Sequence, residues 1–128
     1  VAASRLEDAV RVLGYLTERE LRGLYQTASG FVYPSSCEGF GLPLLEAMAA
    51  GCPLAASTAG AIPEVAGDAA LLFSPEGTED MAAALLRLLE DEALRRSLVE
   101  KGRERVRDFG WADMAAATLA FYRDVLKT

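Results

Sequence analysis

The chain has 128 residues, of which 52% are hydrophobic and 25% are charged, and its formal net charge at pH 7 is −6. This length predicts a single domain that is large enough for a buried core. The acidic balance argues against nucleic-acid binding, which needs a basic surface to displace counterions. Because charged residues interrupt every long apolar segment, we expect a soluble protein without a membrane span, which needs about 18 apolar residues.

The sequence contains two cysteines and no histidine. Cys37 and Cys52 do not resemble a secreted disulfide framework in a chain this rich in Ala and Leu, so we expect reduced thiols in a cytoplasmic protein. The lack of histidine excludes imidazole catalysis and the usual zinc sites. The sequence begins at Val1 with neither an initiator Met nor a signal peptide, from which we expect a fragment or processed product of a longer protein.

Strand and helix patterns alternate in the first part of the chain, and the last part is helical throughout. Thr17 and Glu20 predict a capping box at the start of a helix. Pro34 ends a strand, because proline cannot donate to a strand ladder, and Gly51 and Gly110 mark helix breaks. The expected elements are, in chain order, strand 10–16, helix 17–28, strand 30–34, a helix that ends at Gly51, strand 52–58, a short helix within 61–67 started by Pro63, strand 69–75, and helices at about 78–90, 92–107 and 111–126.

This alternation predicts the fold class. Strands and helices at this spacing indicate parallel crossover units. We therefore expect an α/β fold over residues 1–128, with a Rossmann-like parallel sheet, flanking helices on both faces and a helical C-terminal tail. In such open sheets, ligands bind beyond the carboxyl ends of the strands.

The stretch "SSCEGFGLPLLEAMAAG", residues 35–51, places a glycine-rich loop between a strand and a helix. The N–H groups of Gly41 and Leu42, with the positive end of the helix, form an anion site that most simply suits phosphate. Glu38 precedes the helix, and Glu46 lies about one turn, or roughly 6 Å, along it from Leu42. Carboxylates there can accept hydrogen bonds from hydroxyls on either side of a phosphate.

A ligand with hydroxyls at two ends and phosphates in the middle fits this pattern, as a nucleotide diphosphate sugar does. The spacing alone leaves a second interpretation open. Glycine-rich loops before helices are common, and Glu38 and Glu46 then serve as a solvated turn residue and a surface helix residue.

The same stretch closely resembles the signature of the retaining GT-B glycosyltransferases that use nucleotide-sugar donors. In that signature two glutamates are separated by seven residues, and here they are Glu38 and Glu46 in "EGFGLPLLEAMAAGCPLAAS". The resemblance extends to residues 10–35 before the loop and 57–89 after it. It implies that the chain is most of the C-terminal, donor-binding half of a GT-B fold and that the N-terminal acceptor domain is absent from it.

The resemblance implies a role for individual positions. Glu38 is the catalytic carboxylate that approaches the donor sugar, and Glu46 holds the ribose hydroxyls. The other donor-binding residues are Gly39, Phe40, Gly41 and Leu42 against the sugar and diphosphate, and Gly14, Tyr15 and Leu16 at the base-binding edge. No cofactor and no metal ion are expected, because the nucleotide sugar is a substrate and the family needs no metal. The complete enzyme is expected in the cytoplasm or at the inner face of the membrane.

Two departures from the family pattern affect activity. The family's Arg and Lys pair, which neutralises the diphosphate, is missing, since Arg5 stands alone before residue 10. With that charge and the acceptor domain absent, we expect no transfer from this chain alone. The turn before "PEV" also departs, reading Ala59, Gly60, Ala61, and we assign it no role.

Other residues receive plainer interpretations. Cys37 has no histidine to activate it and is expected to line the pocket. Glu64 is expected to complement a helix dipole. The family's C-terminal helix braces the N-terminal domain. We therefore expect self-association as a homodimer, through an apolar stripe on this helix or through the exposed side of the sheet, unless the helix folds back on its own domain. The stripe comprises Leu119, Phe121, Tyr122 and Val125.

Two alternative functions stay open at this point. One is a non-catalytic GT-B-like module that binds nucleotides or another protein, although such a relic has no physical need for both glutamates and the glycine loop. The other is half of a GT-B epimerase or phosphorylase. A phosphorylase needs a lysine for its cofactor, and the lysines here, Lys101 and Lys127, both lie in the helical tail.

Overall fold

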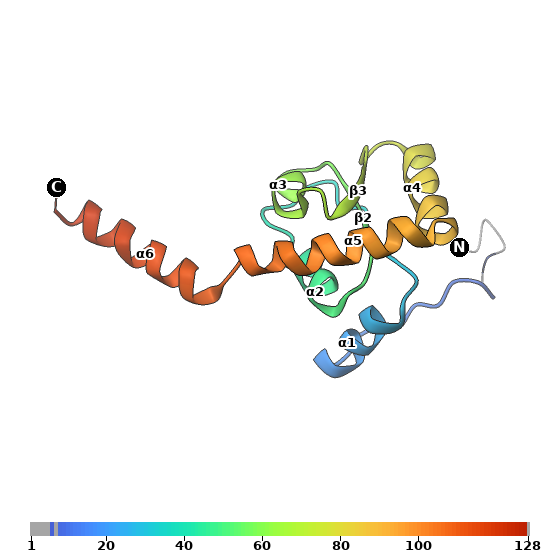
Figure 1. Ribbon diagram of the computed structural model, residues 1–128, viewed down its shortest axis with the longest axis horizontal. Helices are drawn as coiled ribbons and strands as arrows, with labels where there is room; N and C mark the ends of the chain where they lie inside the picture. The colour runs from blue at the N-terminus through green and yellow to red at the C-terminus, as the bar shows by residue number, and fades with distance from the viewer. Residues whose placement is uncertain (1–5, 7, 128) are drawn as a thin grey trace.

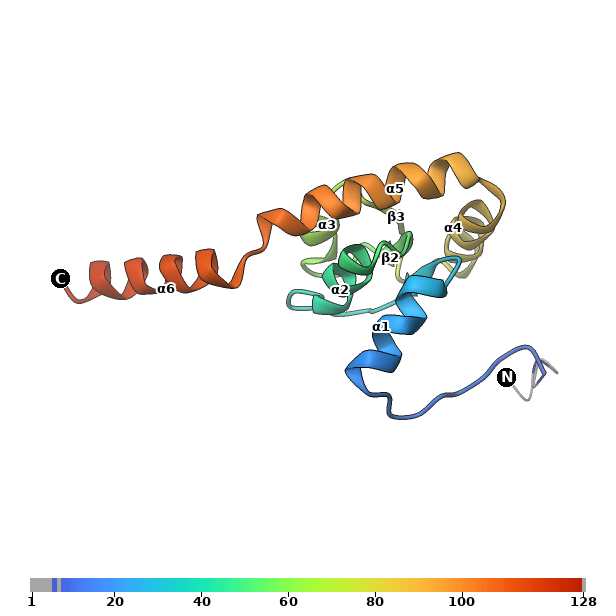
Figure 2. The same ribbon diagram turned by 60° about the horizontal axis from the view of Figure 1, so that its bottom comes forward.

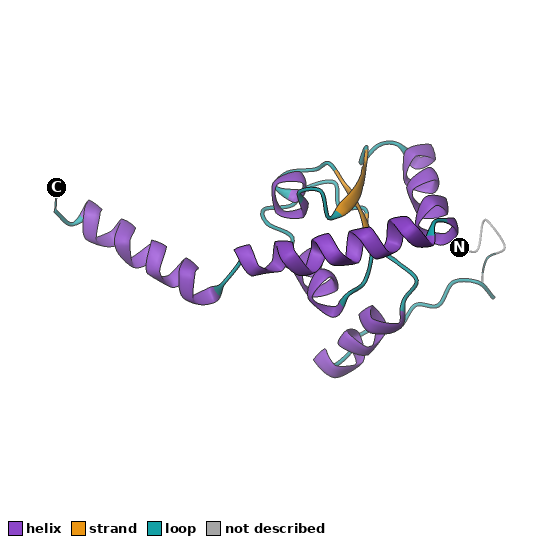
Figure 3. Cartoon of the chain, viewed as in Figure 1, coloured by secondary structure: helices purple, strands orange, loops and turns teal. Residues whose placement is uncertain are grey.

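The computed structural model describes residue 6 and residues 8–127. It forms a short sheet surrounded by helices (Figures 1 and 3). The elements are α1 (Glu18–Thr27), β1 (Phe31–Tyr33), α2 (Leu42–Ala50), β2 (Leu54–Ser57), α3 (Ile62–Ala66), β3 (Ala70–Phe73), α4 (Thr78–Glu90), α5 (Glu92–Arg105), the 3₁₀ helix η2 (Val106–Asp108) and α6 (Trp111–Val125).

The sheet is parallel and has the order β1-β2-β3, with β2 in the centre. Helices cover both faces of the sheet. Alternate residues of a strand point to opposite faces, so neighbouring residues of β2 pack against different helices. Leu54 and Ala56 belong to a buried cluster with Leu44 of α2, whereas Ala55 packs with Leu88 of α4. Figure 2 shows α2 and α4 on opposite sides of β2. The predicted Rossmann-like fold class is confirmed.

The prediction of a strand at 10–16 is wrong. In the described part of the chain this segment pairs with no strand, and the side chains of Val12 and Tyr15 are 89% and 95% exposed. A β-branched run becomes a strand only where a neighbouring strand accepts its hydrogen bonds and covers its side chains. Here the segment lies apart from the sheet and runs toward the start of α1 (Figure 2).

The other expected elements are present with small shifts at their ends. The capping box of α1 is confirmed, since the Glu20 N–H donates to Thr17 Oγ1 at 3.4 Å and the Thr17 N–H donates to Glu20 Oε2 at 2.9 Å. Gly51 ends α2 in the left-handed conformation with φ of 79°, as a helix stop requires. The helix expected at 92–107 is divided, because α5 ends at Arg105 and η2 follows.

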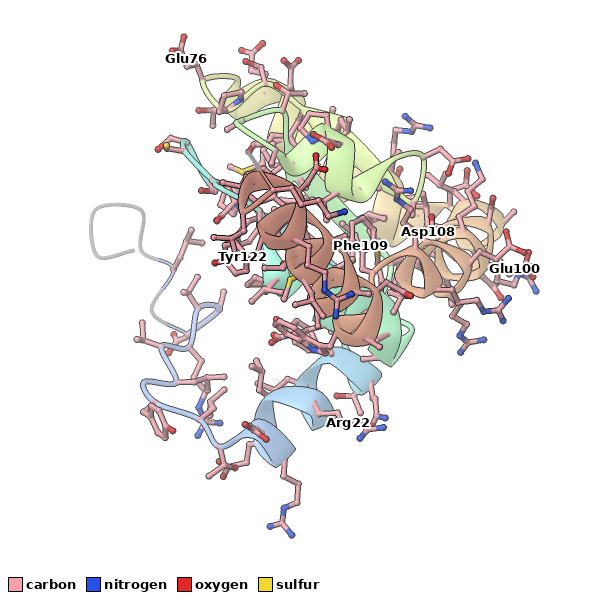
Figure 4. The ribbon with its side chains drawn as sticks, turned by 90° about the vertical axis from the view of Figure 1, so that its left-hand side faces the viewer. Arg22, Glu76, Glu100, Asp108, Phe109 and Tyr122 are labelled. Atoms are coloured by element: carbon pink, nitrogen blue, oxygen red, sulfur yellow. The ribbon has the colours of Figure 1, made fainter. Side chains whose placement is uncertain are left out.

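Helix α6 extends away from the rest of the molecule (Figure 1). None of its residues is buried, and the four side chains of the apolar stripe are between 49% and 64% exposed. Figure 4 looks toward its free end, with Tyr122 on the helix and Phe109 just before it. The helix therefore does not fold back on its own domain. No helix in the described residues is both long and apolar enough to cross a membrane.

Two neighbouring leucines of α4 test the packing of this helix on the sheet. Leu88 is 1% exposed and Leu89 is 57% exposed. Leu88→Ala leaves a cavity against β2, so we expect it to lower the free energy of unfolding by about 2 to 5 kcal/mol. Leu89→Ala is the control and should change it by less than about 0.5 kcal/mol. Urea denaturation measures both, and equal losses would contradict this packing.

The exposed stripe of α6 generates a second prediction, that the chain pairs with a second copy through this helix. Each large apolar side chain gains roughly 1.5 to 3 kcal/mol when it moves from full exposure to burial. We expect light scattering to show a dimer at about 100 μM and Phe121→Asp to restore the monomer. A wild-type monomer at that concentration would mean that association provides less than about 5 to 6 kcal/mol, and the prediction would fail.

Candidate functional site

The signature stretch forms the connection from β1 to α2. Gly41 lies immediately before α2 with φ of 94°, a left-handed conformation that favours glycine. No side chain caps the N-terminus of α2. Pro43 has no N–H, and the Leu44 N–H donates to the carbonyl of Gly41 at 3.0 Å. At this helix start, the N–H groups from which an anion can accept are therefore those of Gly41 and Leu42.

Glu38 lies in this connection and is held as an ionised carboxylate. The hydroxyl of Tyr33, the last residue of β1, donates a hydrogen bond to it. This bond is the main reason why the pKa of Glu38 lies below its ordinary value, and the N–H groups of Phe40 and Gly39 lower that pKa further. The same bond, followed by burial, raises the pKa of Tyr33.

The connection between β2 and α3 supports the backbone of this loop. The buried Ser57, at the end of β2, donates its hydroxyl to the carbonyl of Ser35. The Ala61 N–H donates to the carbonyl of Glu38 at 3.2 Å. Gly60 has φ of 54°, and a Cβ there would overlap that same carbonyl oxygen. The turn to which the sequence analysis assigned no role therefore fixes the position of Glu38.

Glu46 lies on the exposed face of α2 and lines a different part of the surface. It borders a groove of about 540 Å³ between α1 and α2. The groove is lined by Glu18, Leu21, Arg22, Tyr25, Glu46, Ala49 and Ala50. Burial raises the pKa of Tyr25, and the nearby charge of Glu46 adds to this. Glu38 is not among the lining residues, so this groove contains only one of the two glutamates of the signature.

The expected base-binding edge leads directly into the helix that lines this groove. Gly14 has φ of 68°, Tyr15 is 95% exposed, and Leu16 is partly buried just before Thr17 caps α1. The segment therefore lies next in the chain to one wall of the Glu46 groove, although it forms no strand.

Phe40, in the glycine loop, makes a contact that the sequence analysis missed. Its ring meets the ring of Phe109 edge-on, with 5.7 Å between the centroids. The guanidinium of Arg105 lies 4.9 Å from the centroid of Phe109 and donates to the carbonyls of Glu64 and Val65. The sequence offered no sign of this contact, because Phe40 and Phe109 are far apart in the chain.

The cysteines and the basic residues of α5 carry no comparable site. Cys37 and Cys52 are both free, and burial raises the pKa of Cys52. A depression of about 340 Å³ beside α5 contains Arg95 and Arg96. Arg95 donates to the last carbonyls of α4, and Arg96 pairs with Glu92 at 3.6 Å. Both guanidinium groups therefore already have partners within the protein.

A family model described as glycosyl transferases group 1 matches residues 1–105. The chain belongs to this family. The expected resemblance, and the assignment of the chain to glycosyltransferases of this group, are confirmed at the level of the family.

Individual relatives agree with this assignment. The chain is 38% identical over 117 residues to O-antigen chain mannosyltransferase B of Escherichia coli, covering 91% of this chain and 31% of that protein. It is 39% identical over 130 residues to the MMP alpha-(1->4)-mannosyltransferase of Mycolicibacterium hassiacum, covering 98% and 32%. The solved sucrose-phosphate synthase of Thermosynechococcus elongatus matches with a TM-score of 0.88 and 34% identity, covering 98% and 32%. The chain thus spans about a third of the length of these relatives, and its GT-B fold class is confirmed.

Gly60 provides a direct test of the loop support. Gly60→Ala forces a side chain against the Glu38 carbonyl and strains a left-handed backbone, so we expect it to lower the free energy of unfolding by more than about 1 kcal/mol. Gly23→Ala in α1 is the control, because a Cβ there meets nothing within 4 Å. It should be neutral or stabilise by about 0.5 to 1 kcal/mol. A Gly60→Ala variant as stable as wild type in urea would show that the two loops are not in contact.

Proposed function

We propose that this chain is the donor-binding domain of a retaining glycosyltransferase and that it binds a nucleotide-diphosphate sugar. One observation carries the proposal. An ionised glutamate, Glu38, is fixed at the carboxyl end of β1 beside the uncapped N-terminus of α2. A site with a helix N-terminus next to a carboxylate suits a ligand in which a phosphate adjoins a polyhydroxylated group.

The parts of the donor are assigned from this arrangement and, for the ribose and the base, from the resemblance of the signature. The diphosphate accepts hydrogen bonds from the N–H groups of Gly41 and Leu42, where the dipole of α2 is positive. Glu38 accepts from sugar hydroxyls, and Glu46 accepts from the ribose hydroxyls in the groove between α1 and α2. The base lies along Gly14, Tyr15 and Leu16. The retaining outcome rests on the resemblance of the signature, and the names of two relatives make mannose the first sugar to test.

We propose that positive charge for the leaving diphosphate, and the acceptor site, come from parts of the protein outside this chain. Transition-state stabilisation at a departing diphosphate depends on preorganised positive charge. The net charge here is −6, and Arg5 lies outside the described residues. The chain alone is therefore a weak binder without transfer activity. No group of metal ligands is present among the described residues, and a metal-independent, cytoplasmic reaction stays part of the proposal.

Calorimetric titration with uridine and guanosine diphosphates and their sugar nucleotides tests the proposal. We expect dissociation constants above about 1 μM, because charge-assisted contacts of the missing basic pair are worth about 1.5 to 3 kcal/mol each. Glu46→Gln removes the ribose carboxylate and should weaken binding of every nucleotide by about tenfold. Glu104→Gln, on the exposed surface of α5, is the matched control and should have no effect.

Three outcomes would each contradict one part of this proposal. Failure of all these nucleotides to bind at millimolar concentration would exclude donor binding. Submicromolar affinity or measurable sugar transfer would show that the missing charge and acceptor domain are dispensable. Equal effects of the two glutamine variants would remove Glu46 from the site.

A further inference from the structure

We propose that Tyr33 is a positioning residue for Glu38. The Tyr33 hydroxyl holds the Glu38 carboxylate in the orientation that receives the donor sugar. The contact between the two residues stands on the structure alone. The consequence for sugar binding rests on the function proposed above.

The phenol ring of Tyr33 is a rigid support. Tyr33 is the last residue of β1 and pairs with Ala56 in the central strand. Its ring lies 5.9 Å from that of Phe31, which in turn meets the ring of Tyr25 edge-on at 5.2 Å. The strand and this row of aromatic rings fix the ring, so the position of the hydroxyl at the edge of the sheet is fixed as well.

The Tyr33 hydroxyl has the largest effect on the pKa of the Glu38 carboxylate, ahead of the N–H groups of Phe40 and Gly39 in the same loop. The turn at Gly60 holds the Glu38 carbonyl, but a glutamate side chain still has three rotatable bonds beyond the Cα atom. Among the described residues, Tyr33 is the side-chain donor that reaches this carboxylate. The hydroxyl therefore selects one side-chain conformation from several.

The chemistry of the bond suits a carboxylate that must receive hydroxyls. An ionised carboxylate has about four acceptor positions. The phenol of Tyr33 occupies one, and the N–H groups of Phe40 and Gly39 occupy at most two more, which leaves room for a sugar hydroxyl. A donor to the charged form also keeps the group ionised, in agreement with the lowered pKa of Glu38 and the raised pKa of Tyr33. Titratable groups around Glu38 are Tyr33 on β1 and, beyond it, Tyr25 on α1.

The first experiment compares binding of nucleotides with and without the sugar. Tyr33→Phe removes the hydroxyl and keeps the ring. We expect it to weaken binding of UDP-glucose or GDP-mannose by about threefold to tenfold, and to leave binding of UDP and GDP unchanged, because Glu38 faces only the sugar. Tyr122→Phe, on the exposed α6, is the matched control and should change neither. Equal weakening of both kinds of nucleotide would overturn the proposal.

The second experiment needs no ligand. Carboxyl carbon NMR follows the titration of Glu38, whose signal is assigned by its loss in Glu38→Gln. We expect the pKa of Glu38 to rise toward its ordinary value in Tyr33→Phe and to stay unchanged in Tyr122→Phe. In Glu38→Gln the pKa of Tyr33 should fall toward its ordinary value, which tests the same bond if Tyr33→Phe does not fold. Unchanged pKa values in both variants would overturn the proposal.

The two experiments separate this inference from the proposed function. If the pKa of Glu38 rises in Tyr33→Phe but wild type binds no nucleotide, then the contact is confirmed and its role toward a donor sugar is refuted. If wild type binds nucleotide sugars and Tyr33→Phe binds them equally well, then the proposed function survives and Tyr33 has no positioning role.

Discussion

The parallel pairing of β2 with both of its neighbours is the constraint on which the site depends. Ala55 and Ala56 are fully buried, on opposite faces of this strand, and their small side chains allow helices to approach both faces closely. Because parallel strands end at the same edge, the segments that follow β1 and β2 emerge side by side. The sheet topology alone therefore places the loop that contains Glu38 next to the turn at Gly60.

Because the sheet topology brings these segments together, the site consists largely of backbone groups. The N–H groups of Gly41 and Leu42 supply the positive end at the start of α2, and the neighbouring turn holds the Glu38 carbonyl. Side chains contribute where orientation matters, as in the hydrogen bond from Tyr33 to Glu38. An acidic domain can hold a diphosphate in this way, because helix N-termini provide local positive potential without cationic side chains. Catalysis requires more positive charge at the leaving diphosphate, and we propose that parts of the protein outside this chain supply it.

The sequence was informative where local chemistry determines the structure, and misleading where distant contacts do. Thr17, Glu20 and Gly51 mark helix ends through bonds within a few residues, so these predictions were confirmed. Residues 10–16 have the composition of a strand, but a strand needs a partner that sequence pattern does not reveal. The contacts of Gly60 with Glu38, and of Phe40 with Phe109, join segments that are far apart in the sequence, and no local pattern could predict them.

We propose that the loop after β1 and the start of α2 together bind a nucleotide sugar. Amide chemical-shift mapping during titration with GDP-mannose and UDP-glucose tests it most directly. We expect the largest shifts on residues 38–42 and around Glu46, with smaller ones at the Gly60 turn that supports the loop. Shifts confined to the arginine-lined depression beside α5, with the loop unchanged, would contradict it.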